Sequence, residues 1–179
     1  FNKRVFEDFL PKHVHKYELI VFYSAFNRYL HNGRAGFVDK HHVCQSESTC
    51  NDSFRNSILQ TIEYMDSLGA KFVFIEQYPR YELLEYDFRD PVRAEKFGRP
   101  LKMLRAMHDD DTYGFVSLFN DRSEDIRRTN SIFCKNIYCT PSVDGQLLYF
   151  NGDHLSSSGS LYMSKFWQEL FELSLQRNK

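Results

Sequence analysis

Residues 147–156 hold the side chain with the clearest chemical potential in the chain, His154. An apolar run typical of a short buried strand is followed by a polar turn, by the histidine, and by small residues that open a helix. A histidine at such a junction is a good general base, because imidazole exchanges protons near neutral pH. The alternative is an ordinary surface histidine in a turn.

A histidine base needs a partner that orients its ring. Asp153 is adjacent on an extended segment, so its side chain points away, and Asp144 lies further back. Asn151 stands three residues before His154, the usual separation of two side chains around one turn. An asparagine accepts a hydrogen bond from the ring but gives no negative charge to an imidazolium. Asn151 therefore argues against full catalytic activity of a site that uses His154 as its base.

The rest of the chain predicts a sheet that holds this junction. Apolar segments at 17–23 and 71–76 flank a helical pattern at 54–68, which predicts a βαβ unit and a parallel sheet. We expect one α/β domain over residues 1–179, a three-layer α/β/α sandwich with a mainly parallel sheet. Further expected elements are helices over 2–10, ended by Pro11, over 90–107, within 120–130 and over 158–175, and a buried strand over 113–119.

Charge and hydropathy exclude several classes of function. The chain has 23 basic and 24 acidic residues, and this balance argues against nucleic acid as a partner. Its apolar runs are far shorter than the ~20 residues of a membrane span, and we find no signal peptide. Because the sequence starts at Phe1 and not at Met, we expect it to be a piece of a longer protein.

Four cysteines form two close pairs, Cys44 with Cys50 and Cys134 with Cys139. Their spacing favours two local disulfides and an oxidising compartment over a zinc site, which prefers C-x2-C-like spacing, or over free thiols. The pairs His13/His15 and His41/His42 lack a spaced carboxylate or cysteine to complete a metal site. We expect neither a metal nor a cofactor.

The pattern L-Y-F-N-G-D-H-L-S-x-x-G resembles the last motif block of SGNH hydrolases. It is most similar to that of the SGNH domain at the C-terminus of acyltransferase-3 membrane proteins, which O-acetylate polysaccharides and other acceptors. In that family the block is Tyr/Phe-Asp-x-x-His-Leu-Ser-x-x-Gly. The matching positions are Tyr149 or Phe150, then His154, Leu155, Ser156 and Gly159. The resemblance implies an SGNH/flavodoxin-like fold, with His154 as the catalytic base.

Two positions depart from the family pattern. The triad aspartate falls on Asn151, and no Gly-Asp-Ser turn, which would carry the nucleophile, occurs in the sequence. Either the serine and its strand lie upstream of Phe1, so that the domain is N-terminally incomplete, or the domain is degenerate. Ala25-x-Asn27 follows the first expected strand where the family has Gly-x-Asn, so Asn27 is the candidate oxyanion donor. A plain turn residue is the alternative there.

The resemblance implies the extracytoplasmic or lumenal domain of a membrane O-acyltransferase. Such a domain moves an acyl group, typically acetyl, between a donor and a hydroxyl acceptor such as that of a glycan. The alternatives are a catalytically degenerate binding or regulatory domain and a secreted carbohydrate or lipid esterase. Without its serine, the chain alone is expected to be inactive.

Overall fold

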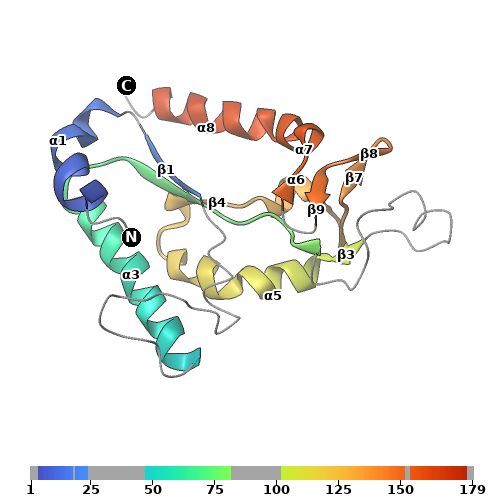
Figure 1. Ribbon diagram of the computed structural model, residues 1–179, viewed down its shortest axis with the longest axis horizontal. Coiled ribbons are helices and arrows are strands. Elements are labelled where there is room, and N and C mark those ends of the chain that lie inside the picture. Colours follow the sequence, from blue (N-terminus) through green and yellow to red (C-terminus); the bar gives the residue numbers. More distant parts are fainter. Residues whose placement is uncertain (1–3, 18, 24–46, 82–101, 152–153, 177–179) are drawn as a thin grey trace. The chain divides into compact units, whose positions relative to one another are not determined.

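A computed structural model describes residues 4–17, 19–23, 47–81, 102–151 and 154–176 (Figure 1). The chain divides into two compact units, which are described separately below. The first unit comprises Phe1–Gln77, Thr112–Arg127 and Ser174–Lys179, and the second comprises Tyr78–Asp111 and Arg128–Leu173.

The first unit is built on a three-stranded parallel sheet. Its strands are β1 (Ile20–Tyr23), β2 (Phe72–Ile75) and β4 (Ile126–Arg127), in the order β1-β2-β4. Helix α3 (Glu47–Ser67) connects β1 to β2. These elements confirm the predicted βαβ unit and the α/β class. The three-layer sandwich and the single domain stay predictions.

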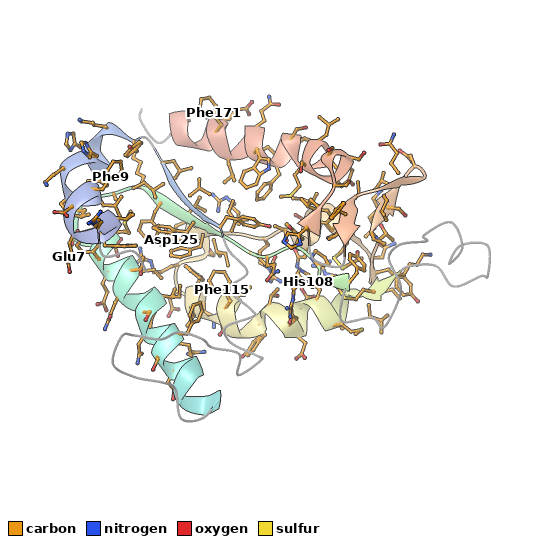
Figure 2. The ribbon with its side chains drawn as sticks, in the orientation of Figure 1. Glu7, Phe9, His108, Phe115, Asp125 and Phe171 are labelled. Carbon is orange, nitrogen blue, oxygen red and sulfur yellow. A yellow bond between two sulfur atoms is a disulfide. The ribbon has the colours of Figure 1, made fainter. Side chains whose placement is uncertain are left out.

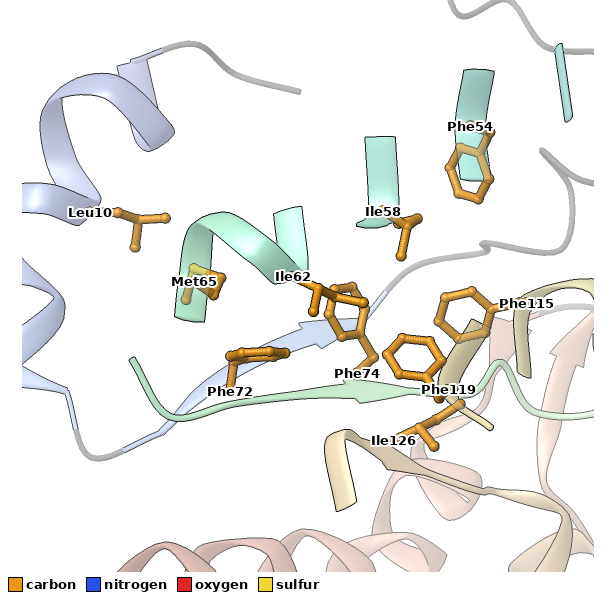
Figure 3. Packing of buried hydrophobic residues seen from close by; sticks show 10 residues of the cluster. All are labelled: Leu10, Phe54, Ile58, Ile62, Met65, Phe72, Phe74, Phe115, Phe119 and Ile126. Atoms are coloured by element: carbon orange, nitrogen blue, oxygen red, sulfur yellow. The ribbon is translucent and has the colours of Figure 1, made fainter. Parts of the chain in front are cut away.

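The core of the first unit lies between α3 and one face of this sheet (Figure 3). Phe72 and Phe74 of β2 share that face because side chains two apart on a strand point the same way. The ring of Phe74 stacks on Phe22, with centroids 4.7 Å apart, and contacts Phe119 at 5.2 Å. The cluster is completed by apolar residues at helical spacing on α3 and by those near the end of α5, namely Phe54, Ile58, Ile62, Met65 and Phe115.

Pro11 does not end the first helical segment. The chain runs through η1 (Val5–Phe9) into α1 (Leu10–His13) and η2 (Val14–Lys16). Pro11 lies in the first turn of α1, where the N–H groups have no partner within that helix, so the missing proline N–H is tolerated. The expectation that Pro11 ends the helix was wrong.

The expected strand over 113–119 was also wrong. These residues belong to α5 (Arg105–Val116) and to the short helix η4 (Ser117–Phe119). The buried positions are His108, Thr112, Phe115 and Phe119, a spacing of four, three and four that is typical of a helix. His108 and Thr112 have polar side chains, so the spacing of apolar residues alone does not reveal the helical period.

Short elements occupy parts of two expected helices. Residues 102–107 open with β3 (Met103–Leu104) before α5 begins, and residues 82–101 lie outside the described part of the chain. The expected helix within 120–130 is instead η5 (Ser123–Asp125), followed by β4 and then by α6 (Asn130–Phe133). Because β4 has two residues, no alternation marks it in the sequence.

The second unit consists of short antiparallel pairs and two helices. β3 pairs with β6 (Tyr138–Cys139), which pairs with β5 (Cys134–Lys135). β7 (Ser142–Val143) and β8 (Gln146–Leu147) form a hairpin, as do β9 (Tyr149–Asn151) and β10 (His154–Leu155). The expected closing helix is confirmed as α7 (Ser157–Tyr162) and α8 (Ser164–Gln176).

One of the two predicted cysteine pairs falls within the described residues. Cys134 and Cys139 are register partners on β5 and β6, and their sulfur atoms lie at disulfide distance. Cys44 lies outside the described residues, so its pairing with Cys50 stays a prediction.

Arg122 joins α3 to η5, the short helix before β4, in the first unit. Its Nη1 atom lies 2.6 Å from Asp66 Oδ2, and its Nε atom lies 2.6 Å from Asp125 Oδ2. The hydrogen bond from Arg122 holds the pKa of Asp66 below its ordinary value of 3.8, against a smaller opposing effect of burial. These contacts raise the pKa of Arg122, so the guanidinium stays charged.

This ion pair predicts a small acid-dependent loss of stability. A carboxylate whose pKa is lowered by folding stabilises the native state above its unfolded pKa, and this contribution is lost as the pH falls through the folded pKa. We expect Asp66→Asn to cost about 1 kcal/mol or less at neutral pH, because both side chains are partly exposed. Urea unfolding of both proteins checks this: the difference should shrink as the pH is lowered below 3.8 and should vanish in acid below the folded-state pKa of Asp66. A difference that persists there would contradict the expectation.

Candidate functional site

The hairpin β9–β10 places Asn151 opposite His154. The two residues are register partners on antiparallel strands, and Leu155 partners Tyr149 after an irregularity. Residues directly opposed in this way have Cβ atoms about 5 Å apart. The side chain of His154 is exposed to solvent. The separation of three residues noted in the sequence thus corresponds to a cross-strand pair.

Ser156 fixes the chain just after the histidine. Its N–H donates to the carbonyl of Leu148 at 2.9 Å, and its hydroxyl donates to the carbonyl of Leu147 at 2.8 Å. The same hydroxyl accepts the N–H of Gly159 at 3.1 Å and so caps α7. Ser156 therefore ties the start of α7 to the strand residues that precede the hairpin.

Gly159 lets α7 approach the backbone of Leu148, between β8 and β9, closely. A Cβ atom at this position would overlap the carbonyl oxygen of Leu148 and lie 2.8 Å from its carbonyl carbon. Only glycine leaves room for this contact. The Ser and Gly of the L-S-x-x-G pattern therefore have a structural role: together they hold the segment that carries His154.

A cluster of aromatic rings packs against Tyr149, a residue of β9 in the same hairpin. Tyr149 is 1% exposed, whereas its neighbour Phe150 is 80% exposed. The ring of Tyr149 meets Tyr81 edge-on with centroids 4.9 Å apart and Tyr78 at 5.7 Å. Phe133 lies 5.8 Å from it on another side. Tyr149 is thus the buried member of the two aromatic residues in the motif.

Judged from the sequence alone, Tyr78, Tyr81 and Tyr86 could stack on a sugar ring or pack within a loop. Tyr78 and Tyr81 are buried, and burial raises the pKa of the Tyr81 phenol. Tyr78 and Tyr81 therefore pack in the protein interior and are not exposed for stacking on a sugar. Tyr86, the third candidate, lies outside the described residues.

A polar network around α5 escaped the sequence analysis. Arg80 is 2% exposed and donates two hydrogen bonds to Asp111: Nη2 to Oδ1 at 2.6 Å and Nε to Oδ2 at 3.2 Å. Asp109 accepts from Arg128 at 2.9 Å and from Asn130 at 3.1 Å. The run Asp109-Asp110-Asp111 was the available signal, but its partners lie about 20 to 30 residues away along the chain.

Two further candidates from the sequence are Asn27 and Glu76, which stands at the end of an expected strand, on the edge where α/β sites form. Asn27, the candidate oxyanion donor, lies outside the described residues, so its role stays a prediction. Glu76 follows β2 directly and is fully buried, and its N–H donates to the carbonyl of Arg127 at 3.0 Å. His108, in the first half of α5, is 1% exposed and was not considered from the sequence (Figure 2).

Neither a metal-binding cluster nor a membrane-spanning helix occurs among the described residues. They contain no cluster of three or more histidine, cysteine, aspartate or glutamate side chains able to hold a metal ion. None of the described helices has the length and hydropathy needed to span a bilayer. His13, from one histidine pair, packs its ring on Phe9 at 4.7 Å.

The parallel βαβ unit agrees with the α/β fold of SGNH hydrolase-like domains, and a family match gives the class of the domain. The family model described as SGNH domain (fused to AT3 domains) matches residues 1–169. The chain therefore belongs to this family of SGNH domains, which is associated with acyltransferases. No curated protein and no solved structure matches the chain.

Proposed function

We propose that the chain is the extracytoplasmic SGNH domain of a membrane O-acyltransferase. It moves an acyl group, typically acetyl, to or from a hydroxyl, as in a glycan acceptor. The family match over residues 1–169 supports the association with a membrane acyltransferase. The observation that carries the chemistry is the exposed side chain of His154, presented on a hairpin that Ser156 and Gly159 anchor. In this proposal the fold is a three-layer sandwich over the whole chain.

The proposed reaction has two acyl-transfer steps. A serine on a strand upstream of Phe1 attacks the donor ester while His154 takes its proton, and His154 then returns this proton to the departing donor alkoxide. In the second step His154 takes the proton of the acceptor hydroxyl, which attacks the acyl-serine. The serine recovers its proton from His154 and leaves. Asn27 donates to the oxyanion in both steps.

The proposal predicts that the chain by itself lacks a nucleophile. We expect it to hydrolyse p-nitrophenyl acetate no faster than its own His154→Ala variant does. In the complete protein, which supplies the serine, His154→Ala should lower kcat/KM by about 10³ or more. Steady-state assays of the four proteins check both expectations. A rate in the short chain that depends on His154 would show that a nucleophile lies within residues 1–179.

Asn151 supports a second candidate function, a catalytically degenerate binding or regulatory domain. An asparagine at the position of the triad acid does not stabilise an imidazolium, and loss of that charge alone costs about 10⁴ in rate in a serine triad. The upstream sequence separates the two proposals. A Gly-Asp-Ser turn there favours the enzyme, and its absence from the complete protein favours the degenerate domain.

A further inference from the structure

The segment from Tyr78 to Tyr81 contacts the hairpin that carries His154. Both tyrosine rings meet Tyr149 edge-on, at 75° to 76° between ring planes. Tyr149 in turn is the register partner of Leu155, the residue after His154. A displacement of Tyr78 or Tyr81 would therefore shift the ring of Tyr149. Through the pairing of Tyr149 with Leu155, it would also shift His154.

The same segment is attached to α5 by a buried ion pair. Arg80 lies between the two tyrosines in sequence, and its side chain and that of Asp111 are 2% and 9% exposed. The guanidinium meets the carboxylate through two hydrogen bonds, of 2.6 Å and 3.2 Å. Two bonds between planar groups fix orientation as well as distance, and water is largely excluded from the pair.

We propose that the Arg80–Asp111 ion pair positions His154 for acyl transfer. Neither side chain is assigned a contact with a substrate, so both are positioning residues. Arg80 is held by Asp111, its neighbours Tyr78 and Tyr81 pack on Tyr149, and Tyr149 holds the β9–β10 pair. The catalytic importance of His154 in this inference rests on the proposed function.

Lysine at position 80 tests the geometry while it keeps the charge. A lysine ammonium is a point charge and cannot reproduce the planar fork of arginine, so the segment must shift to keep the contact with Asp111. The matched control is Arg122→Lys, because Arg122 forms the corresponding contacts with Asp66 and Asp125 in the first unit. Both variants lose a guanidinium fork, but Arg80 belongs to the unit that carries the hairpin and Arg122 belongs to the other unit.

The measurement is the position of the His154 imidazole Cε1–Hε1 resonance, in the 179-residue chain with isotope-labelled histidine. The signal is identified by its disappearance in His154→Gln. We expect Arg80→Lys to move the resonance by more than its linewidth and Arg122→Lys to leave it in place. Asp111→Glu, which moves the carboxylate by one methylene, should move it as well and replaces Arg80→Lys where that variant does not fold.

Two results would overturn the inference. One is an unmoved resonance in a folded Arg80→Lys or Asp111→Glu protein, even with a lowered melting temperature, since the pair would then only stabilise the fold. The other is an equal displacement in Arg122→Lys. In the complete protein Arg80→Lys should also lower kcat by about 10- to 100-fold with KM unchanged. If the complete protein proves inactive, the proposed function fails, and the resonance still decides the positioning role.

Discussion

Replacing Gly159 with alanine should destabilise the second unit by about 3 kcal/mol or more. The new methyl group would overlap the carbonyl of Leu148, and the hydrogen-bonded backbone between β8 and β9 cannot move aside as a flexible side chain can. Alanine favours a helix over glycine by about 1 kcal/mol, which is too little to offset the overlap. We expect α7 to be pushed away from β8 and β9 and the Ser156 bonds to be lost.

Ser160→Ala is the matched control for this prediction. Ser160 is the next residue of α7 and is exposed, so its replacement should change stability by no more than about 0.5 kcal/mol. Urea unfolding followed by circular dichroism gives both values. If Gly159→Ala proves as stable as Ser160→Ala, the close approach of α7 to Leu148 is wrong.

The second large effect is expected from Asn151→Asp in the complete protein. The register of β9 and β10 puts position 151 opposite His154, where a carboxylate can orient the ring and stabilise the imidazolium. An asparagine can accept a hydrogen bond from the ring but brings no charge. We therefore expect kcat to rise by about 10² to 10⁴ for p-nitrophenyl acetate, the range set by the loss of the acid from serine triads.

Asp144→Asn is the control for that gain. Asp144 is the other acid considered from the sequence, and it occupies a turn with φ of 50°, a conformation that asparagine also adopts readily. Activity should be unchanged in Asp144→Asn. A large loss there, together with no gain in Asn151→Asp, would assign the acid to Asp144. If neither variant changes the rate of an active protein, no carboxylate at these two positions assists His154.

Much of the first unit was predictable because its signals are local. The apolar runs around β1 and β2 and the helical spacing on α3 identify a βαβ unit. Because the connecting helix crosses over from one strand to the next, the two strands are parallel. The same holds for the closing helix. The adjacent Asp144 and Gly145 are a local turn signal, and both residues have positive φ. Each of these features is encoded within a few adjacent residues.

The errors have a different cause. Residues 113–119 have the composition of a buried strand, but the helical burial period appears only when His108 and Thr112 are counted as core positions. The two-residue strand β4 has no pattern of its own and exists because β2 offers it hydrogen bonds. Tertiary contacts decided both segments against their local preferences.

The sequence by itself determined the family, the histidine and the doubt about its acid. His154, Ser156, Gly159 and Asn151 lie within nine residues, so a short motif records them. Only the tertiary structure decided how that motif is held. Arg80 reaches Asp111 across 31 positions, and Tyr149 meets Tyr78 and Tyr81 from a distant part of the chain. Such contacts depend on how separate elements pack, a property that no local spacing encodes.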